Sequence, residues 1–224
     1  MDLWIIITTS ALLLIGILFT AYMIFGRSNK NKTIYMVGLS GSGKTKLFYN
    51  VCVNKSYPTI TSQVKNEFQL DVGKKKVQFV DLPGHPRIRT EVLAAIKNAD
   101  AIIFTIDSET VLRVINDIAN FLYDILCVPE IYTKRIPIMI LSTKNDIPGS
   151  RSIDIIKSEL EREIDDIRAN RQQSNFVENN ENIFIGEQGK EFEFSQLNNN
   201  VQFATCSVVH EDISEVLKFI QENA

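Results

Sequence analysis

The chain has 224 residues, of which 45% are hydrophobic and 23% charged, and its formal net charge is −3. This length predicts one domain of ordinary size, with room for a short appendage. The charge balance excludes a general nucleic-acid surface, because no basic excess is available to neutralise phosphates. Three cysteines without metal-ligand spacing indicate thiols in a reducing compartment rather than a disulfide framework: Cys52, Cys127 and Cys206.

An uncharged segment of 23 residues, Leu3 to Phe25, lies near the start of the chain. As a helix it would span roughly 34 Å, enough to cross the hydrocarbon core of a membrane. A cleaved signal peptide is the alternative, but it requires a basic start and a shorter apolar run. We therefore predict a single-pass anchor and short linker in residues 1–32. Basic residues after the segment place the C-terminal side in the cytosol by the positive-inside rule: Arg27, Lys30 and Lys32.

Residues 33–224 alternate short apolar runs with helix-length segments. The apolar runs predict strands over 33–37, 68–72, 76–82, 101–107, 136–142 and 201–205, and the turn-like Gly73 predicts a hairpin between the second and third. Helices are expected over 86–98, 108–127, 152–169 and 212–222, with Ser108 as a candidate cap of the second. This alternation predicts an α/β fold with a mixed, mostly parallel sheet and helices on both faces.

One segment, 170–200, breaks this rhythm. It is rich in Asn and Gln and lacks sustained periodicity, so we interpret it as a polar surface insertion, partly disordered. Its end, "GKEFEFSQL" (189–197), alternates Phe with acidic residues and predicts a short edge strand.

The sequence "GLSGSGKT" matches the phosphate-binding pattern G-x-x-x-x-G-K-[ST], between a predicted strand and a plausible helix. Glycines let backbone N–H groups turn toward phosphate oxygens, and the helix N-terminus adds its partial positive charge. The Lys is expected to reach the β- and γ-phosphates, and the final hydroxyl to ligate Mg²⁺. The candidate residues are Gly38, Leu39, Ser40, Gly41, Ser42, Gly43, Lys44 and Thr45.

The turn "TKND", directly after the strand 136–142, predicts that the base is guanine. The Asp146 carboxylate can accept hydrogen bonds from guanine N1–H and N2–H, whereas adenine N1 is itself an acceptor. Lys144 would pack its stem along the base, and Thr143, where Asn is usual, would brace the phosphate loop. At the end of the last strand, a backbone N–H of the pair Cys206 and Ser207 is expected to meet guanine O6.

The stretch "DLPGH" predicts the sensor of the terminal phosphate. Asp81 is expected to bind Mg²⁺ through water and the Gly84 N–H to meet the γ-phosphate. Thr59 and Thr61 are both candidates for the switch threonine that closes on Mg²⁺, with Thr61 preferred. His85 stands where many nucleotide hydrolases carry a Gln. It would either orient the attacking water or cap the helix after it and line a partner interface.

These motifs, in this order, resemble those of Ras-like GTPases. The chain also resembles the family of the signal recognition particle receptor β subunit, over essentially its whole length. The features that carry this resemblance are the motif "DLPGH", the segment "GKEFEFSQL" and the N-terminal anchor. The resemblance implies GTP, GDP and Mg²⁺ as ligands, and a cytosolic GTPase domain on the endoplasmic reticulum membrane. In its GTP state it would hold the N-terminal domain of the receptor α subunit, and through it the signal recognition particle, the ribosome and the protein-conducting channel.

Translation GTPases share Pro-Gly-His at the phosphate sensor and hydrolyse when a partner positions the His, so hydrolysis is expected to be slow unaided. Two other classes of protein are alternatives. A trafficking or coat-assembly GTPase of the Arf type would carry a lipid or amphipathic helix rather than a full membrane span. A phosphate-loop ATPase or kinase would not need Asp146.

Overall fold

The computed structural model describes residues 4, 8, 12, 13, 15, 16, 20, 31–53, 62, 64–178, 183–210 and 212–224, with the backbone alone for 172–178. The chain divides into two compact units, Met1–Asn31 and Lys32–Ala224, and the elements below belong to the second. Within the residues described, no helix is both long and apolar enough to cross a membrane. Most of the predicted anchor, 3–25, lies outside the described residues.

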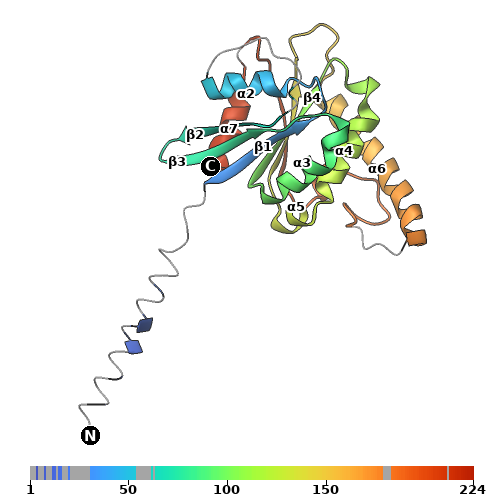
Figure 1. Ribbon diagram of the computed structural model, residues 1–224. Helices are drawn as coiled ribbons and strands as arrows, with labels where there is room; N and C mark the ends of the chain where they lie inside the picture. Colours follow the sequence, from blue (N-terminus) through green and yellow to red (C-terminus); the bar gives the residue numbers. More distant parts are fainter. Residues whose placement is uncertain are drawn as a thin grey trace. The chain divides into compact units, whose positions relative to one another are not determined.

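In the part of the chain that the structure describes, six strands form one sheet in the order β2-β3-β1-β4-β5-β6 (Figure 1). Only β2 and β3 pair antiparallel, through the turn at Gly73, and every other neighbouring pair is parallel. This topology confirms the predicted mostly parallel sheet with one hairpin. The strands are β1 (Lys32–Gly38), β2 (Asn66–Val72), β3 (Lys75–Asp81), β4 (Ala101–Asp107), β5 (Ile138–Thr143) and β6 (Val201–Thr205).

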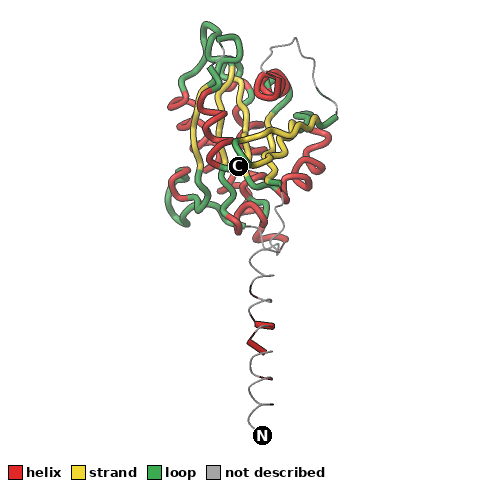
Figure 2. Tube along the Cα trace, turned by 90° about the vertical axis from the view of Figure 1, so that its left-hand side faces the viewer, coloured by secondary structure: helices red, strands yellow, loops and turns green. Residues whose placement is uncertain are grey.

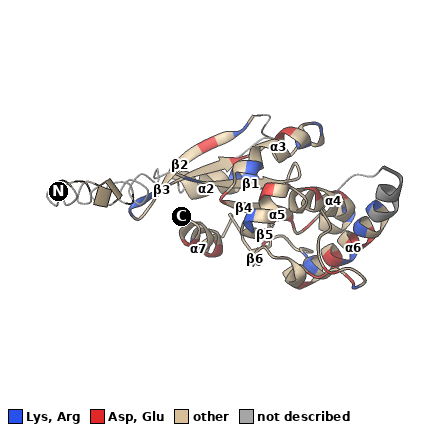
Figure 3. Ribbon diagram, turned by 90° about the horizontal axis from the view of Figure 1, so that it is seen from below, with Lys and Arg blue, Asp and Glu red and all other residues tan. Residues whose placement is uncertain are grey.

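Helices cover both faces of the sheet, as the alternating pattern predicts (Figures 2 and 3). On one face, α2 (Lys44–Val53) and α7 (Ser214–Glu222) pack on a core that includes Phe79 and Ile103. The other face is covered by α3 (Arg89–Ala95), α4 (Ile115–Leu126), α5 (Pro129–Lys134) and α6 (Ile153–Glu178). Burial on both sides explains why the central strands β4 and β5 are continuous apolar runs.

Two predicted helices differ from the structure. The segment 86–98 is broken into a 3₁₀ turn, Pro86–Ile88, then α3 and a second 3₁₀ turn, Ile96–Asn98. The segment 108–127 becomes helical only at Ile115, after the 3₁₀ turn Val111–Arg113. Ser108 does not cap it, because its hydroxyl donates to the Thr143 carbonyl at 2.7 Å instead. The short helix α5 follows and was not predicted.

The predicted edge strand within 189–197 is wrong. The insertion begins as the last turns of α6, and its end makes a 3₁₀ turn, Phe194–Gln196, rather than a strand. Phe192 and Phe194 are buried, but their backbone N–H groups donate to Asp165 Oδ1 and Glu161 Oε1 of α6. The Phe–Glu alternation therefore reflects a segment packed on a helix, with α6 carboxylates in place of a neighbouring strand.

Arg168 of α6 binds the backbone of the segment that precedes the 3₁₀ turn Phe194–Gln196. Its guanidinium, in a side chain only 7% exposed, donates to the Glu187 carbonyl at 3.2 Å, to the Lys190 carbonyl and to Asp165. The same group lies 5.9 Å from the centre of the Phe192 ring. One buried cation thus satisfies several carbonyl groups that would otherwise have no strand partner.

Candidate nucleotide site

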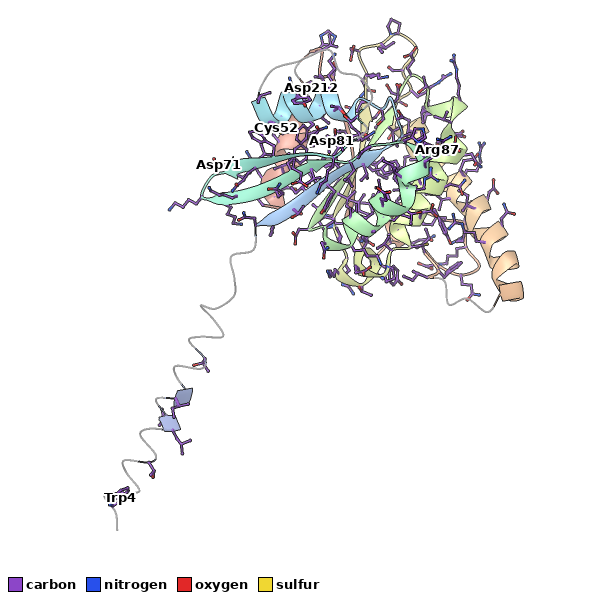
Figure 4. The ribbon with its side chains drawn as sticks, viewed as in Figure 1. Trp4, Cys52, Asp71, Asp81, Arg87 and Asp212 are labelled. Carbon is purple, nitrogen blue, oxygen red and sulfur yellow. The ribbon has the colours of Figure 1, made fainter. Side chains whose placement is uncertain are left out.

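The predicted site residues that the structure describes follow the carboxyl ends of β1, β3, β5 and β6, and Figure 4 labels one of them, Asp81. The sheet register brings them together, because Met36 is level with Asp81 and Asp107 is level with Thr143. Parallel strands present their carboxyl ends at one edge, which is where open α/β sheets bind ligands. The motifs, far apart in sequence, thus form one site.

The phosphate loop connects β1 directly to α2. Its first residue, Gly38, lies so close to β4 that a Cβ there would be 2.4 Å from the Thr105 carbonyl oxygen. Thr105 Oγ1 donates to the Val37 carbonyl and shares a 2.8 Å hydrogen bond with Ser42 Oγ. Ser42 is buried, so its side chain supports the loop from beneath. The result is a narrow loop at a helix N-terminus, a geometry that suits an anion.

Lys44 lies folded over this loop. Its ammonium group donates to the Leu39 carbonyl at 2.8 Å and lies 3.5 Å from Ser42 Oγ, and the residue is only 6% exposed. Burial lowers the pKa of Lys44 to about 8, although the nearby Asp81 carboxylate opposes the shift. A buried ammonium bound mainly to neutral groups is short of negative charge, which a phosphate would supply.

Asp81 closes the other side of the site, at the end of β3 (Figure 4). Its Oδ2 accepts from Thr45 Oγ1 at 2.8 Å and from Asn66 Nδ2 at 3.1 Å. Its Oδ1 is buried and has no hydrogen-bond partner among the residues described, and burial raises the pKa of the carboxyl group. A buried carboxylate oxygen without a partner, beside a Thr hydroxyl, fits the donor set that Mg²⁺ takes at a phosphate site.

The sensor loop rests directly on the phosphate loop. The Ser40 N–H donates to the Gly84 carbonyl at 3.1 Å, and a Cβ on Gly84 would lie 2.5 Å from the Gly38 carbonyl oxygen. His85 is exposed, and its Nδ1 accepts from the Arg87 N–H at 3.2 Å. His85 thus has the geometry of the predicted cap, and its second ring nitrogen remains available for other contacts.

The base turn is fixed to both neighbouring elements. Thr143 Oγ1 is buried and donates to the Ser42 carbonyl at 2.9 Å and to the Ile106 carbonyl at 3.1 Å. Thr143 therefore braces the phosphate loop, the role that its position suggested. Lys144 follows with the left-handed φ of 60°, which is uncommon for a residue with a side chain.

Asp146 is held by Ser207, two residues after the end of β6. Ser207 Oγ donates to Asp146 Oδ1 at 2.7 Å, and this hydrogen bond lowers the pKa of the Asp146 carboxyl group. The Ser207 side chain thereby orients the ionised Asp146 carboxylate, which guanine recognition needs as an acceptor. The sequence had predicted only a backbone contact for Ser207. The N–H groups of Cys206 and Ser207 donate to the carbonyls of Ser142 and Asp212, so the contact with guanine O6 stays a prediction.

The two switch threonine candidates, Thr59 and Thr61, lie outside the described residues. Sequence reasoning missed several contacts. Ser62 shares a 2.9 Å hydrogen bond with Thr45 Oγ1, and Asn66 reaches Asp81. Asp107 forms an ion pair with Lys144. A polar residue at the end of a buried strand was the available signal for Asp107, whereas pairing across the sheet was needed to find Asn66.

The family model described as the signal recognition particle receptor beta subunit matches residues 29–201. The chain belongs to that family. It is 32% identical over 213 residues to signal recognition particle receptor subunit beta of Dictyostelium discoideum, covering 88% of this chain and 73% of that protein. With its human counterpart the identity is 33% over 193 residues, covering 83% and 71%.

Solved structures of this family have the same fold. The structure of the mammalian signal recognition particle receptor matches with a TM-score of 0.78 and 31% identity, over 86% of this chain and 100% of that one. A receptor from Chaetomium thermophilum, solved with GTP and a partner designated SRX, matches with a TM-score of 0.69 over 85% and 99%. Its identity is 22%, so that match supports the fold alone.

Proposed function

We propose that the chain is a membrane-anchored GTP-binding switch of the signal recognition particle receptor. In its GTP state it would hold the N-terminal domain of the α subunit at the endoplasmic reticulum. The observation that carries the nucleotide site is the hydrogen bond from Thr143 Oγ1 to the Ser42 carbonyl at 2.9 Å. This hydrogen bond joins the base turn to the phosphate loop, 101 residues away in the sequence. One site then has a part that would recognise the base and a part that would recognise the phosphates.

The residues divide the work of binding. The phosphate-loop N–H groups and Lys44 would bind the phosphates, and Asp146 with Lys144 would bind the guanine base. Thr45 and Asp81 would hold Mg²⁺, which when bound neutralises charge on the phosphates. Thr59 or Thr61 would complete that site. The Gly84 N–H would read the terminal phosphate, so that the two contacting loops respond to its loss.

His85 would contribute to hydrolysis only when a partner reorients it. As a cap, its Nδ1 is engaged with the Arg87 N–H at 3.2 Å, on a surface-exposed ring. Water activation would require the ring to point to the terminal phosphate instead. We therefore propose slow hydrolysis in the isolated chain, with GTP binding as the main event.

The membrane part of the proposal concerns the N-terminal residues. Residues 1–32 would form the anchor and linker, with one span over 3–25, and 33–224 the cytosolic GTPase domain. The support is the uncharged sequence and the basic residues that follow it. Glycosylation sites placed before residue 3 and after residue 224 test this topology. Modification of the second site alone would contradict it.

The nucleotide is tested first. The full chain, purified in detergent, is expected to retain GDP or GTP, identified by chromatography after denaturation. It should capture the α-subunit N-terminal domain when loaded with a non-hydrolysable GTP analogue and release it when loaded with GDP. Bound ATP would refute the nucleotide assignment, and equal capture in both states would refute the switch.

The Arf-type trafficking role is the second candidate. It is favoured by a 32% identity over 133 residues to ADP-ribosylation factor D of Dictyostelium discoideum, covering 58% of this chain and 60% of that protein. Capture of the α-subunit domain separates the two roles, because a trafficking GTPase would not bind it.

A further inference from the structure

The pair Asp107 and Lys144 lies at the base end of the site. Asp107 is the last residue of β4, and its Oδ2 is 2.6 Å from Lys144 Nζ. The two side chains are 12% and 34% exposed, so the ion pair is largely shielded from water. Shielding makes such a contact stronger and more directional than an ion pair on an open surface.

The local backbone holds Asp107 ready for this contact. Its other oxygen, Oδ1, accepts from the Glu109 N–H at 3.0 Å, which fixes the side chain and leaves Oδ2 for Lys144. The next residue, Ser108, donates from both its N–H (3.1 Å) and its Oγ (2.7 Å) to the Thr143 carbonyl. Two successive residues, Asp107 at the end of β4 and Ser108 after it, therefore bind the base turn, through an ion pair and through hydrogen bonds.

Lys144 needs such support. Its φ of 60° is costly for a residue with a side chain, and this kind of strain persists where surrounding contacts enforce it. A free lysine stem has many rotamers, and ordering it on binding would reduce affinity. With the ammonium held by Asp107, the stem is already ordered before any ligand arrives.

We propose that Asp107 is a positioning residue for the guanine site, acting through Lys144 to pre-order one wall of the base pocket. The inference rests on the proposed function. It assigns part of the nucleotide affinity to a carboxylate outside the three motifs read from the sequence. The ligand concerned is the base of a guanine nucleotide, not its phosphates.

Release of fluorescent GDP from the full chain, chased with excess GDP, tests this in four variants: Asp107→Asn, Lys144→Met, the double variant and Asp100→Asn. Asp107→Asn keeps the size and the acceptor for Glu109 and should speed release about tenfold, as expected for a lost charge-assisted hydrogen bond. The double variant should match Lys144→Met alone, because Asp107 acts only through that lysine. Asp100→Asn, at the other end of β4, should release GDP like the wild type.

Two further readouts separate positioning from general loosening. The thermal midpoint of the nucleotide-free Asp107→Asn chain should stay close to that of Asp100→Asn. The factor by which Mg²⁺ slows GDP release should be unchanged, since the phosphate end is untouched. An unaltered release rate, or effects of Asp107→Asn and Lys144→Met that multiply in the double variant, would overturn the proposal. A wild-type chain that holds no guanine nucleotide would overturn the proposed function, and this inference with it.

Discussion

Replacing Thr143 with Val tests whether one hydroxyl joins the two halves of the nucleotide site. Val keeps the shape of the side chain and removes only the donor. The hydroxyl has a single proton, so its contacts with the Ser42 and Ile106 carbonyls count as one shared hydrogen bond. Loss of one buried hydrogen bond of this kind costs about 1–2 kcal/mol. For a chain of this size the thermal midpoint should fall by about 3–6 °C.

Thr143→Val should also speed the release of bound nucleotide. The phosphate loop loses its tie to the base turn, and if most of the 1–2 kcal/mol is expressed there, GDP release should accelerate roughly five- to thirtyfold. The assay is displacement of fluorescent GDP by stopped flow, beside a thermal melt of the nucleotide-free chain. Thr143→Ser, which keeps the hydroxyl, should release GDP close to the wild-type rate.

The matched control is Thr133→Val in α5. Its hydroxyl also donates to a carbonyl, that of Pro129 at 2.7 Å, but at an exposed helix remote from the site. This variant should leave GDP release unchanged. If Thr143→Val lowers the thermal midpoint yet releases GDP at the wild-type rate, the hydroxyl is structural alone. If neither quantity moves, the reasoning from this hydrogen bond is refuted.

Three other buried charges give measurable outcomes. Because the pKa of Lys44 is about 8 without ligand and phosphate needs its protonated form, GDP affinity should fall about fourfold from pH 7 to 8.5. The stability of the nucleotide-free chain should rise from about pH 8 to 10.5, since the unfolded chain then binds more protons; the same sign in both titrations would contradict this assignment. Asp81→Asn should stabilise the nucleotide-free chain in thermal melts, as it removes a buried charge with an unpartnered oxygen. It should also abolish the slowing of GDP release by Mg²⁺, and persistence of that slowing would exclude Asp81 from the metal site. Arg168→Met should lower the thermal midpoint by about 6–12 °C, a loss of roughly 3 kcal/mol from unsatisfied carbonyls, whereas Arg162→Met on the exposed face of α6 should change it little.

The sheet was predictable because its central strands are buried on both faces. A run such as "AIIFTID" has one plausible place in an α/β protein, and β4 occupies it with only Asp107 partly exposed. The motifs were predictable for a related reason, since each follows such a strand. The parallel topology then brings their positions to one edge.

The segment 189–197 was misread because alternation alone does not reveal its partner. Phe192 and Phe194 are buried, as in a strand, yet their own backbone N–H groups donate to α6 carboxylates. Local pattern reports which side chains are buried, but not which group accepts the backbone N–H. That choice depends on Asp165 and Glu161 of α6, which lie 27 and 33 residues earlier in the sequence.

The contacts that order the site were hidden for a different reason. The sequence alone did not reveal the role of Asp107 or of the Ser207 side chain, because each role depends on a partner, 37 and 61 residues away. Motif residues can be recognised from the sequence alone. The residues that orient them can be identified only from the folded structure, in which the strands bring them next to the motifs. A guanine site needs both kinds, since an unordered Asp146 or Lys144 would lose affinity to side-chain entropy.

The two phosphate elements are joined by backbone, and this has a consequence for switching. Gly84 approaches Gly38 so closely that a Cβ on Gly84 would lie 2.5 Å from the Gly38 carbonyl oxygen, and the Ser40 N–H donates to the Gly84 carbonyl. A phosphate that draws the Gly84 N–H toward itself would move the Pro83–Gly84 peptide. The Gly84 Cα would pass this movement to the next peptide, Gly84–His85, whose carbonyl accepts the Ser40 hydrogen bond. The state of the terminal phosphate would therefore reach His85, one residue on, through the two peptide units that meet at Gly84, and so alter the exposed surface beside α3.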